Sequence, residues 1–241
     1  MDSMTFNGTL VERIDRTADS ASFRFSRPSE YRFEAGQWFS ITIPSPQGPL
    51  QHIFSHADSP TEKWTELTTR LTGSDFKLAL CDLPLGGSAV FNGPAGHFVF
   101  RYQEPKLAFL VGGIGITPVR SMLRYLMDTG GAGRVTGQEL VLFYGCMSED
   151  AIVYREELDE IAAALPGLRV VYVITEPAPD WTGRSGFVTA QMLREELGDP
   201  REWTFYVVGP PAMIKAMDSV TELLQVDSTR IVKENFAGYG S

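Results

Sequence analysis

Cysteine and histidine are scarce in this sequence. The chain has 241 residues, with two cysteines, Cys81 and Cys146, and three histidines. Two cysteines cannot supply the four thiolates that an iron–sulfur cluster commonly uses. They are also too few for a disulfide framework, so a reducing, cytoplasmic setting is expected. Three scattered histidines do not indicate a metal site, and none is predicted.

The sequence also has few basic residues and no long apolar runs. The 21 basic residues are outnumbered by 30 acidic ones, which gives a formal net charge of -9. Nucleic acids and anionic membranes bind basic patches, so neither partner is predicted. No apolar run is long enough to span a bilayer. The first fifteen residues contain no apolar segment, and we therefore expect no signal peptide.

The sequence instead contains two different patterns. Up to about residue 101, short runs with alternating apolar positions are separated by Gly, Pro, Asp and Ser, which predicts an antiparallel β-barrel or sandwich. From residue 107 onwards strands alternate with helices, which predicts a parallel α/β sheet with helices on both faces. We place the boundary within residues 102–105, which gives predicted domains of 1–102 and 103–241.

The expected elements follow from these periodicities. Strands are predicted at residues 6–17, 20–28, 36–44, 64–72, 88–96, 97–102, 107–111, 140–144, 168–175, 205–208 and 230–232. Helices are predicted at residues 74–83, 119–127, 154–165, 189–197 and 212–224, the first with Ser74 as its N-cap.

A glycine-rich junction follows the first parallel strand, in the stretch "LAFLVGGIGITPVRSML". The junction contains Gly112, Gly113, Gly115, Thr117 and Pro118. The glycines remove Cβ atoms, Thr117 can cap the next helix, and Pro118 suits the first helical position. A phosphate or a flat ring can therefore approach the backbone at a helix N-terminus, beyond the carboxyl end of a strand. The G-x-G-x-x-G fingerprint is not met, and a turn that serves only packing is the alternative.

A second junction, in "FYVVGPPAMIKAM", has the same character. Gly209 gives close access to the backbone, and Pro210 and Pro211 stiffen the turn. Met213 could face either a ligand or the core. By itself this is a common α/β turn, but it strengthens the interpretation of the first junction.

Three motifs together resemble the ferredoxin–NADP reductase family. They are "GGIGITP", then "VGPPAMI" about ninety residues later, and the closing "ENFAGY". The resemblance implies a flavin-binding antiparallel barrel joined to a Rossmann-like α/β domain that binds a nicotinamide nucleotide. It implies FAD rather than FMN as cofactor, and NADH or NADPH as co-substrate. Electrons would pass to a separate acceptor, either a protein such as ferredoxin or a small molecule.

The resemblance also implies flavin-binding residues in the first half. The family motif Arg-x-Tyr/Phe-Ser is matched by His52, Ile53, Phe54 and Ser55. Phe54 would lie against the flavin ring, and Ser55 would hydrogen-bond either the polar edge of the ring or the ribityl chain, both close to the chemistry. His52 stands where the family usually has Arg, and it lacks the permanent charge and the bidentate fork of Arg. The alternative is that these are ordinary strand residues.

A second flavin element is implied further along the chain. Thr69, Arg70 and Leu71 would line the flavin's chain, and Gly73, Ser74 and the following helix N-terminus would hold its pyrophosphate. Arg70 either supplies the charge missing at His52 or is a solvated strand residue.

The C-terminal segment is implied to reach the flavin. Phe236 or Tyr239 would cover the ring or occupy the place of the nicotinamide, and Thr117 would shape the nicotinamide pocket. Glu234 is a candidate for a proton path, with a plain surface charge as the alternative.

The co-substrate is only weakly specified. Glu149 or Asp150 would favour a free ribose hydroxyl, whereas Arg155 and Arg184 could hold a 2′-phosphate, and the balance is slightly toward NADH. Two alternative functions remain at this point. One is a free flavin or quinone reductase, and the other is a flavin-binding subunit without turnover in an electron-transfer complex.

Overall fold

The chain forms two compact units, which we call the barrel unit and the α/β unit. The computed structural model describes residues 3–130 and 137–235. The barrel unit takes Met1–Phe100 and also Thr117–Asp128, and the α/β unit takes Arg101–Ile116 and Thr129–Ser241. The predicted domains 1–102 and 103–241 stay a prediction, since the units describe only which segments pack together.

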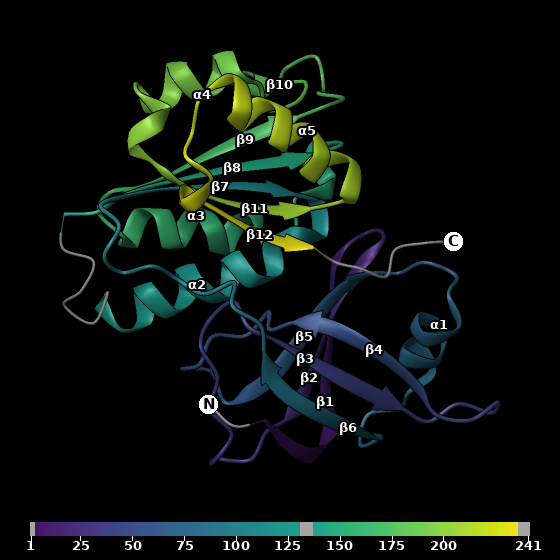
Figure 1. The fold of residues 1–241 in the computed structure, drawn as a ribbon. Coiled ribbons are helices and arrows are strands. Elements are labelled where there is room, and N and C mark those ends of the chain that lie inside the picture. Colours follow the sequence, from purple (N-terminus) through teal and green to yellow (C-terminus); the bar gives the residue numbers. More distant parts are fainter. Residues whose placement is uncertain (1–2, 131–136, 236–241) are drawn as a thin grey trace. The chain divides into compact units, whose positions relative to one another are not determined.

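The barrel unit is a six-stranded antiparallel sheet with strand order β4-β3-β6-β1-β2-β5 (Figure 1). Its elements are β1 (Met4–Thr17), β2 (Ser20–Ser26), β3 (Trp38–Ile43), β4 (Leu50–Ser55), β5 (Trp64–Arg70), α1 (Asp75–Asp82) and β6 (Ser88–Ala95). The predicted antiparallel barrel is confirmed. In β2 the aromatic residues Phe23 and Phe25 face the core, whereas Arg24 between them faces the other side, where it pairs with Glu66 of β5.

One predicted strand is wrong. Residues 97–102 alternate in polarity, but they form no strand. Gly96, at a φ of +95°, turns the chain out of the sheet after β6. Phe98 and Phe100 are buried by packing, with no ladder of backbone hydrogen bonds. An alternation of polar and apolar residues therefore predicts which side chains are buried, but it does not predict which backbone groups form hydrogen bonds.

The α/β unit is a six-stranded parallel sheet with strand order β10-β9-β8-β7-β11-β12. Its strands are β7 (Lys106–Gly112), β8 (Glu139–Cys146), β9 (Leu168–Ile174), β10 (Arg184–Ser185), β11 (Thr204–Gly209) and β12 (Ile231–Asn235). Its helices are α3 (Arg155–Ala164), α4 (Ala190–Leu197) and α5 (Pro211–Leu223), whereas α2 (Ile116–Asp128) belongs to the barrel unit from Thr117 onward. Short 3-10 helices are η1 (Gly113–Gly115), η3 (Glu149–Ala151), η4 (Pro200–Glu202) and η5 (Ser228–Arg230).

The predicted parallel sheet with helices on both faces is confirmed. Within this unit α4 and α5 cover one face of the sheet and α3 covers the other (Figure 1). The central strand β7 is therefore buried from Leu107 to Gly112, as expected for a parallel strand with helices on both sides. The sequence analysis did not predict the two-residue strand β10, because a strand this short has no periodicity to detect.

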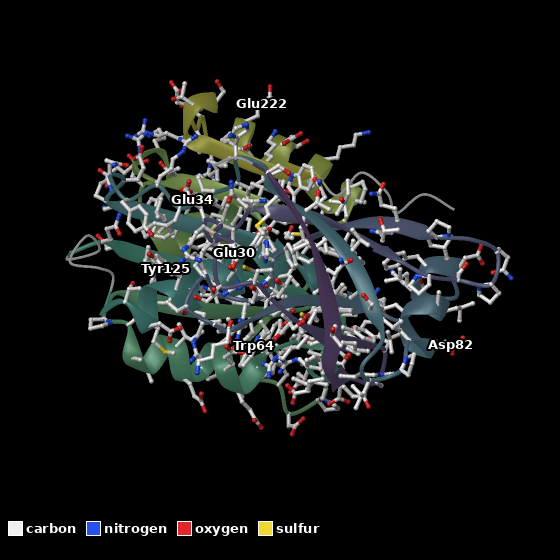
Figure 2. The ribbon with its side chains drawn as sticks, turned by 90° about the horizontal axis from the view of Figure 1, so that it is seen from below. Glu30, Glu34, Trp64, Asp82, Tyr125 and Glu222 are labelled. Atoms are coloured by element: carbon white, nitrogen blue, oxygen red, sulfur yellow. The ribbon has the colours of Figure 1, made fainter. Side chains whose placement is uncertain are left out.

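Charged side chains lie mainly on the outside of both units. Glu222 of α5 and Asp82 at the end of α1 are exposed and project from the ribbon in Figure 2. No helix in the described ranges is long and apolar enough to cross a membrane.

Candidate functional site

Three adjacent strands of the α/β unit carry a glycine at their last or next-to-last residue. Gly112 at the end of β7 pairs in register with Gly145 of β8, and Gly209 ends the neighbouring strand β11. We call Gly145, Gly112 and Gly209 the glycine row. Because all three strands are parallel, the row lies along the carboxyl edge of the sheet, where α/β proteins bind ligands. These three positions carry no side chain of their own, although the Met213 side chain lies close to Gly112 and Gly209.

The glycines at the first junction are required by close packing and by backbone conformation. A Cβ on Gly115 would lie 2.8 Å from the carbonyl oxygen of Val208 and 3.0 Å from Cα of Gly209. Gly113 has a φ of +50°, in the left-handed region that favours glycine. A Cβ on Gly209 would lie 2.9 Å from Sδ of Met213, and one on Gly112 would collide with the same sulfur. The structure thus brings Gly112, Gly115, Gly209 and Met213 together, although Met213 also serves packing.

Two details of this junction were predicted incorrectly. The 3-10 turn η1 runs directly into α2, so the helix begins at Ile116 and not after Thr117. Thr117 therefore lies inside the helix and does not cap it, and Pro118 is the third helical residue and not the first. Proline is tolerated there because the first four N–H groups of a helix have no intrahelical partner.

The sequence interpretation missed Tyr144 and Gly145. Tyr144 is fully buried, and its hydroxyl donates a hydrogen bond of 3.0 Å to the carbonyl oxygen of Gly113. Burial raises the pKa of the Tyr144 phenol well above its usual value, which keeps the donor protonated. The Tyr144 phenol thus stabilises the 3-10 turn η1 through this hydrogen bond. The sequence did contain a signal for Gly145. The three strands share the tripeptides "LVG", "FYG" and "VVG", each with glycine as its last residue.

In the barrel unit, the expected flavin motif lies on the edge strand β4. The His52 ring stacks on Phe54 at 4.7 Å between centroids, and both rings lie beside Phe76 of α1, at 5.3 and 5.7 Å. His52 Nδ1 accepts a hydrogen bond of 2.8 Å from the N–H of Ile53. His52 therefore acts here as a packing residue, and Ile53 is half exposed.

Ser55 ends the same strand with an unsatisfied group. Its hydroxyl is buried, and it has no hydrogen-bond partner among the residues that the structure describes. A buried polar atom without a partner costs about 1–3 kcal/mol, so a bound ligand that hydrogen-bonds this hydroxyl would recover that energy. Ser55 thus fits the role that the family motif implies.

The second flavin element lies where β5 leads into α1. Thr69 is buried, Leu71 packs at the edge of the barrel core, and a Cβ on Gly73 would meet only open space. Ser74 is the N-cap of α1, as predicted, but its side chain makes no capping hydrogen bond. The exposed side chain of Arg70 pairs with Asp19 at 3.1 Å. Exposed pairs of this kind are weak, so Arg70 is not committed to Asp19.

Lys77 of α1 adds a second cation that the sequence interpretation did not place here. Its side chain is buried. Burial and the nearby positive charge of Arg70 lower the pKa of Lys77 below its usual value. Two cations beside the N-terminus of α1 repel each other, and this repulsion destabilises the charged form of Lys77. A bound phosphate would attract both cations and offset that repulsion. The residues present therefore fit the pyrophosphate of FAD.

The C-terminal candidates are only partly described. Glu234 lies on the edge strand β12, paired in register with Val208 of β11. Burial raises its pKa to about 7, which is unlike an ordinary surface glutamate. Phe236 and Tyr239 lie outside the described residues.

The two arginines considered for a 2′-phosphate both form ion pairs with carboxylates. Arg155 pairs with Asp159 at 3.2 Å and lies 4.2 Å over the ring of Tyr172. Arg184 is held by Glu195 and Glu196 of α4, at 2.7 and 2.6 Å. Neither guanidinium is left without an acidic partner.

Comparisons with known proteins agree with this arrangement. A family model described as an oxidoreductase NAD-binding domain matches residues 109–219. Ferredoxin–NADP reductase B of Sorangium cellulosum is 32% identical over 193 residues, which are 76% of this chain and 77% of that protein. NADH-cytochrome b5 reductase 1 of Aspergillus terreus is 28% identical over 240 residues, which are 95% and 80% of the two chains.

Solved structures share the fold. The cytochrome b5 reductase domain of Ulva prolifera nitrate reductase matches with a TM-score of 0.83 and 20% identity, over 96% of this chain and 97% of that one. A ferredoxin NADP+ reductase from Neisseria gonorrhoeae, with bound FAD and NADP, matches with a TM-score of 0.81 and 18% identity over 96% and 98%. At sequence identities this low, the comparison shows that the folds are similar and nothing more.

Proposed function

Because the chain belongs to the ferredoxin–NADP reductase family of flavoprotein reductases, we propose that it carries electrons from NADH through FAD to a separate acceptor. The observation that carries this proposal is the glycine row, which aligns three glycines of neighbouring parallel strands at the carboxyl edge of the sheet. We assign the nicotinamide nucleotide to this edge of the α/β sheet, and the family resemblance implies that Thr117 and Pro118 also contact it.

The residues of the barrel unit have distinct proposed roles. Ser55 donates its unsatisfied hydroxyl to the polar edge of the flavin, and Phe54 supports the ring. Arg70, Lys77 and the N–H groups near Gly73 hold the pyrophosphate. The chemistry that bound FAD would supply is acceptance of a hydride equivalent from the nicotinamide and release of electrons singly or as a pair. Glu234, whose pKa is about 7, exchanges a proton with solvent near neutral pH.

Purification of the chain tests the flavin assignment. We expect a yellow protein that releases FAD on denaturation. The variant S55A should bind FAD about tenfold more weakly, because it removes one hydrogen bond to the flavin. A colourless protein that cannot be reconstituted with any flavin would rule out the proposal.

We propose NADH as the preferred nucleotide. A 2′-phosphate prefers a cation near the carboxyl ends of β8 and β9, and at Arg155 and Arg184 it would have to compete with the carboxylates that already pair with these arginines. Glu149 in η3 and Glu176 after β9 add negative charge at this edge. The ratio kcat/KM should therefore be at least about tenfold higher with NADH than with NADPH, a difference of about 1.4 kcal/mol. Equal or higher efficiency with NADPH would contradict this assignment.

The acceptor is proposed to be a separate one-electron carrier protein. The sequence has two cysteines, Cys81 and Cys146, which form no disulfide with each other, and two thiolates are too few to hold an iron–sulfur cluster that could receive the electrons. Two cysteines without a disulfide also support the proposal of a cytoplasmic location. Relatives are named for ferredoxin, for cytochrome b5 and as the reductase subunit of a stachydrine N-demethylase.

Steady-state NADH oxidation separates the possible acceptors. Turnover with ferredoxin or cytochrome b5 supports the proposal. Turnover only with free flavin or quinones identifies a flavin or quinone reductase instead. Bound FAD without turnover on any acceptor identifies a non-catalytic subunit.

A further inference from the structure

We infer that Arg120 of α2 is a positioning residue for hydride transfer, which acts through a buried ion pair with Glu62 to fix Thr117 relative to Ser55. The inference rests on the proposed assignment of Thr117 to the nicotinamide and of Ser55 to the flavin. All the residues of this ion pair and its neighbours lie in the barrel unit.

Arg120 is bound on one side to the segment that follows β4. Its guanidinium is almost completely buried and donates a 2.8 Å hydrogen bond to the carbonyl oxygen of Ala57. It also donates to both carboxylate oxygens of Glu62, at 2.5 and 3.0 Å. Ser121 donates a 2.5 Å hydrogen bond to the carbonyl oxygen of Asp58. The first turns of α2 are thus tied to residues 57–62 by several bonds.

The segment that receives these bonds is itself held rigidly. Asp58 accepts hydrogen bonds from Arg27 at 2.8 Å and from the N–H of Glu66 at 2.8 Å, and it contacts His56 Nδ1 at 2.9 Å. The His56 Nε2 atom lies 3.1 Å from the hydroxyl of Tyr31. Every one of these side chains is buried or nearly so, so none can leave without exposing an unpaired polar group.

The spacing along the chain connects this network to both proposed sites. Ala57 follows Ser55 by two residues, and Arg120 follows Thr117 by three, which is less than one helical turn. The division between the two units also falls between Ile116 and Thr117. Thr117 is therefore placed by the unit that carries Ser55, whereas Gly112 belongs to the other unit. The ion pair of Arg120 and Glu62 fixes this placement.

The test uses the FAD-bound protein and the variants R120Q, R120K and E62Q. Stopped-flow absorbance gives the rate of flavin reduction by saturating NADH, expressed per bound FAD, and the dissociation constant of NADH. We expect R120Q and E62Q to lower the rate at least about tenfold, because small misplacements of reacting groups are costly, while NADH affinity changes less than about twofold. R120K, which keeps the charge, should recover part of the rate. The control R124Q removes the partly exposed pair of Arg124 with Asp128 on the same helix and should leave the rate unchanged.

A purely structural role predicts a different outcome. The variants would then show a lower Tm or less bound FAD, but an unchanged reduction rate per bound FAD, and that result would overturn the inference. If R120Q does not fold, R120K and E62Q still decide between the two outcomes. The variants T117A and S55A distinguish a second failure. If they lower the rate while R120K and E62Q do not, the site assignment stands and the inference is wrong; if none has an effect, both are wrong.

Discussion

At the scale of single residues, the informative groups are those whose environment does not suit their charge. Lys77 is a buried cation beside another cation, and Glu234 is a half-buried carboxylate. Ser55 is a buried hydroxyl without a partner among the described residues. Ser55 would be more stable with a hydrogen-bonding ligand and Glu234 with a proton, and perturbed groups of this kind are typical of functional sites.

The variant K77M should weaken FAD binding at least about tenfold, because one charge-assisted contact to the pyrophosphate is lost. Binding an anion raises the lysine pKa that burial and Arg70 lower in the free protein, so FAD binding should take up protons. The affinity of the wild-type protein should therefore fall as the pH rises toward the usual pKa of lysine. Fluorescence titrations with FAD at several pH values measure both effects. An affinity in K77M equal to that of the wild type would contradict this role.

Glu234 should make the free energy of unfolding depend on pH. Its folded-state pKa of about 7 lies above the unfolded value of 4.5, so the folded state binds more protons between these values. Stability should therefore fall as the pH rises from about 4.5 to about 7. E234Q should exceed the wild type in stability at pH 8 by about 1–3 kcal/mol more than at pH 5, after allowance for partial exposure. Urea denaturation at both pH values tests this. An equal difference between the two proteins at both pH values would refute it.

At the scale of helices and strands, the sequence predicts most of the fold. The helices and longer strands of the α/β unit appear where periodicity places them, because each depends on local patterns of burial. The partners of a buried charge cannot be predicted in this way. Arg120 and Glu62 are 58 positions apart, and nothing near either residue indicates the other. Likewise, the sequence predicts glycines at strand ends, but their alignment depends on the order of the strands.

Gly115 and Gly145 should respond differently to alanine. In G115A the new Cβ would lie 2.8 Å from the carbonyl oxygen of Val208, which forces a backbone shift and should cost about 1–3 kcal/mol of stability. In G145A the nearest atom would be 3.5 Å away, so stability should change by no more than about 0.5 kcal/mol. The methyl group of G145A should instead raise the KM for NADH, because it projects from the glycine row. Thermal unfolding and steady-state kinetics together test this contrast, and equal destabilisation of both variants would contradict it.

At the scale of the whole molecule, charge is the property with consequences for the acceptor. The net charge of -9 should repel anions at long range, and salt screens that repulsion. The kcat/KM for ferricyanide should therefore rise several-fold between about 10 and about 200 mM salt, whereas that for a neutral quinone should not. A fall with salt would instead reveal a local basic patch where electrons leave the protein.

The position of α2 restricts how the protein can be divided. A cut between residues 102 and 103 would separate Thr117–Asp128 from the barrel unit with which it packs. Glu62 would then lose Arg120 and become a carboxylate without its buried counter-ion. Chimaeras made by exchanging halves with a relative should therefore fold only when the donor of residues 57–62 also supplies residues 117–128. The part of the protein that should be exchanged as a whole is thus discontinuous along the chain.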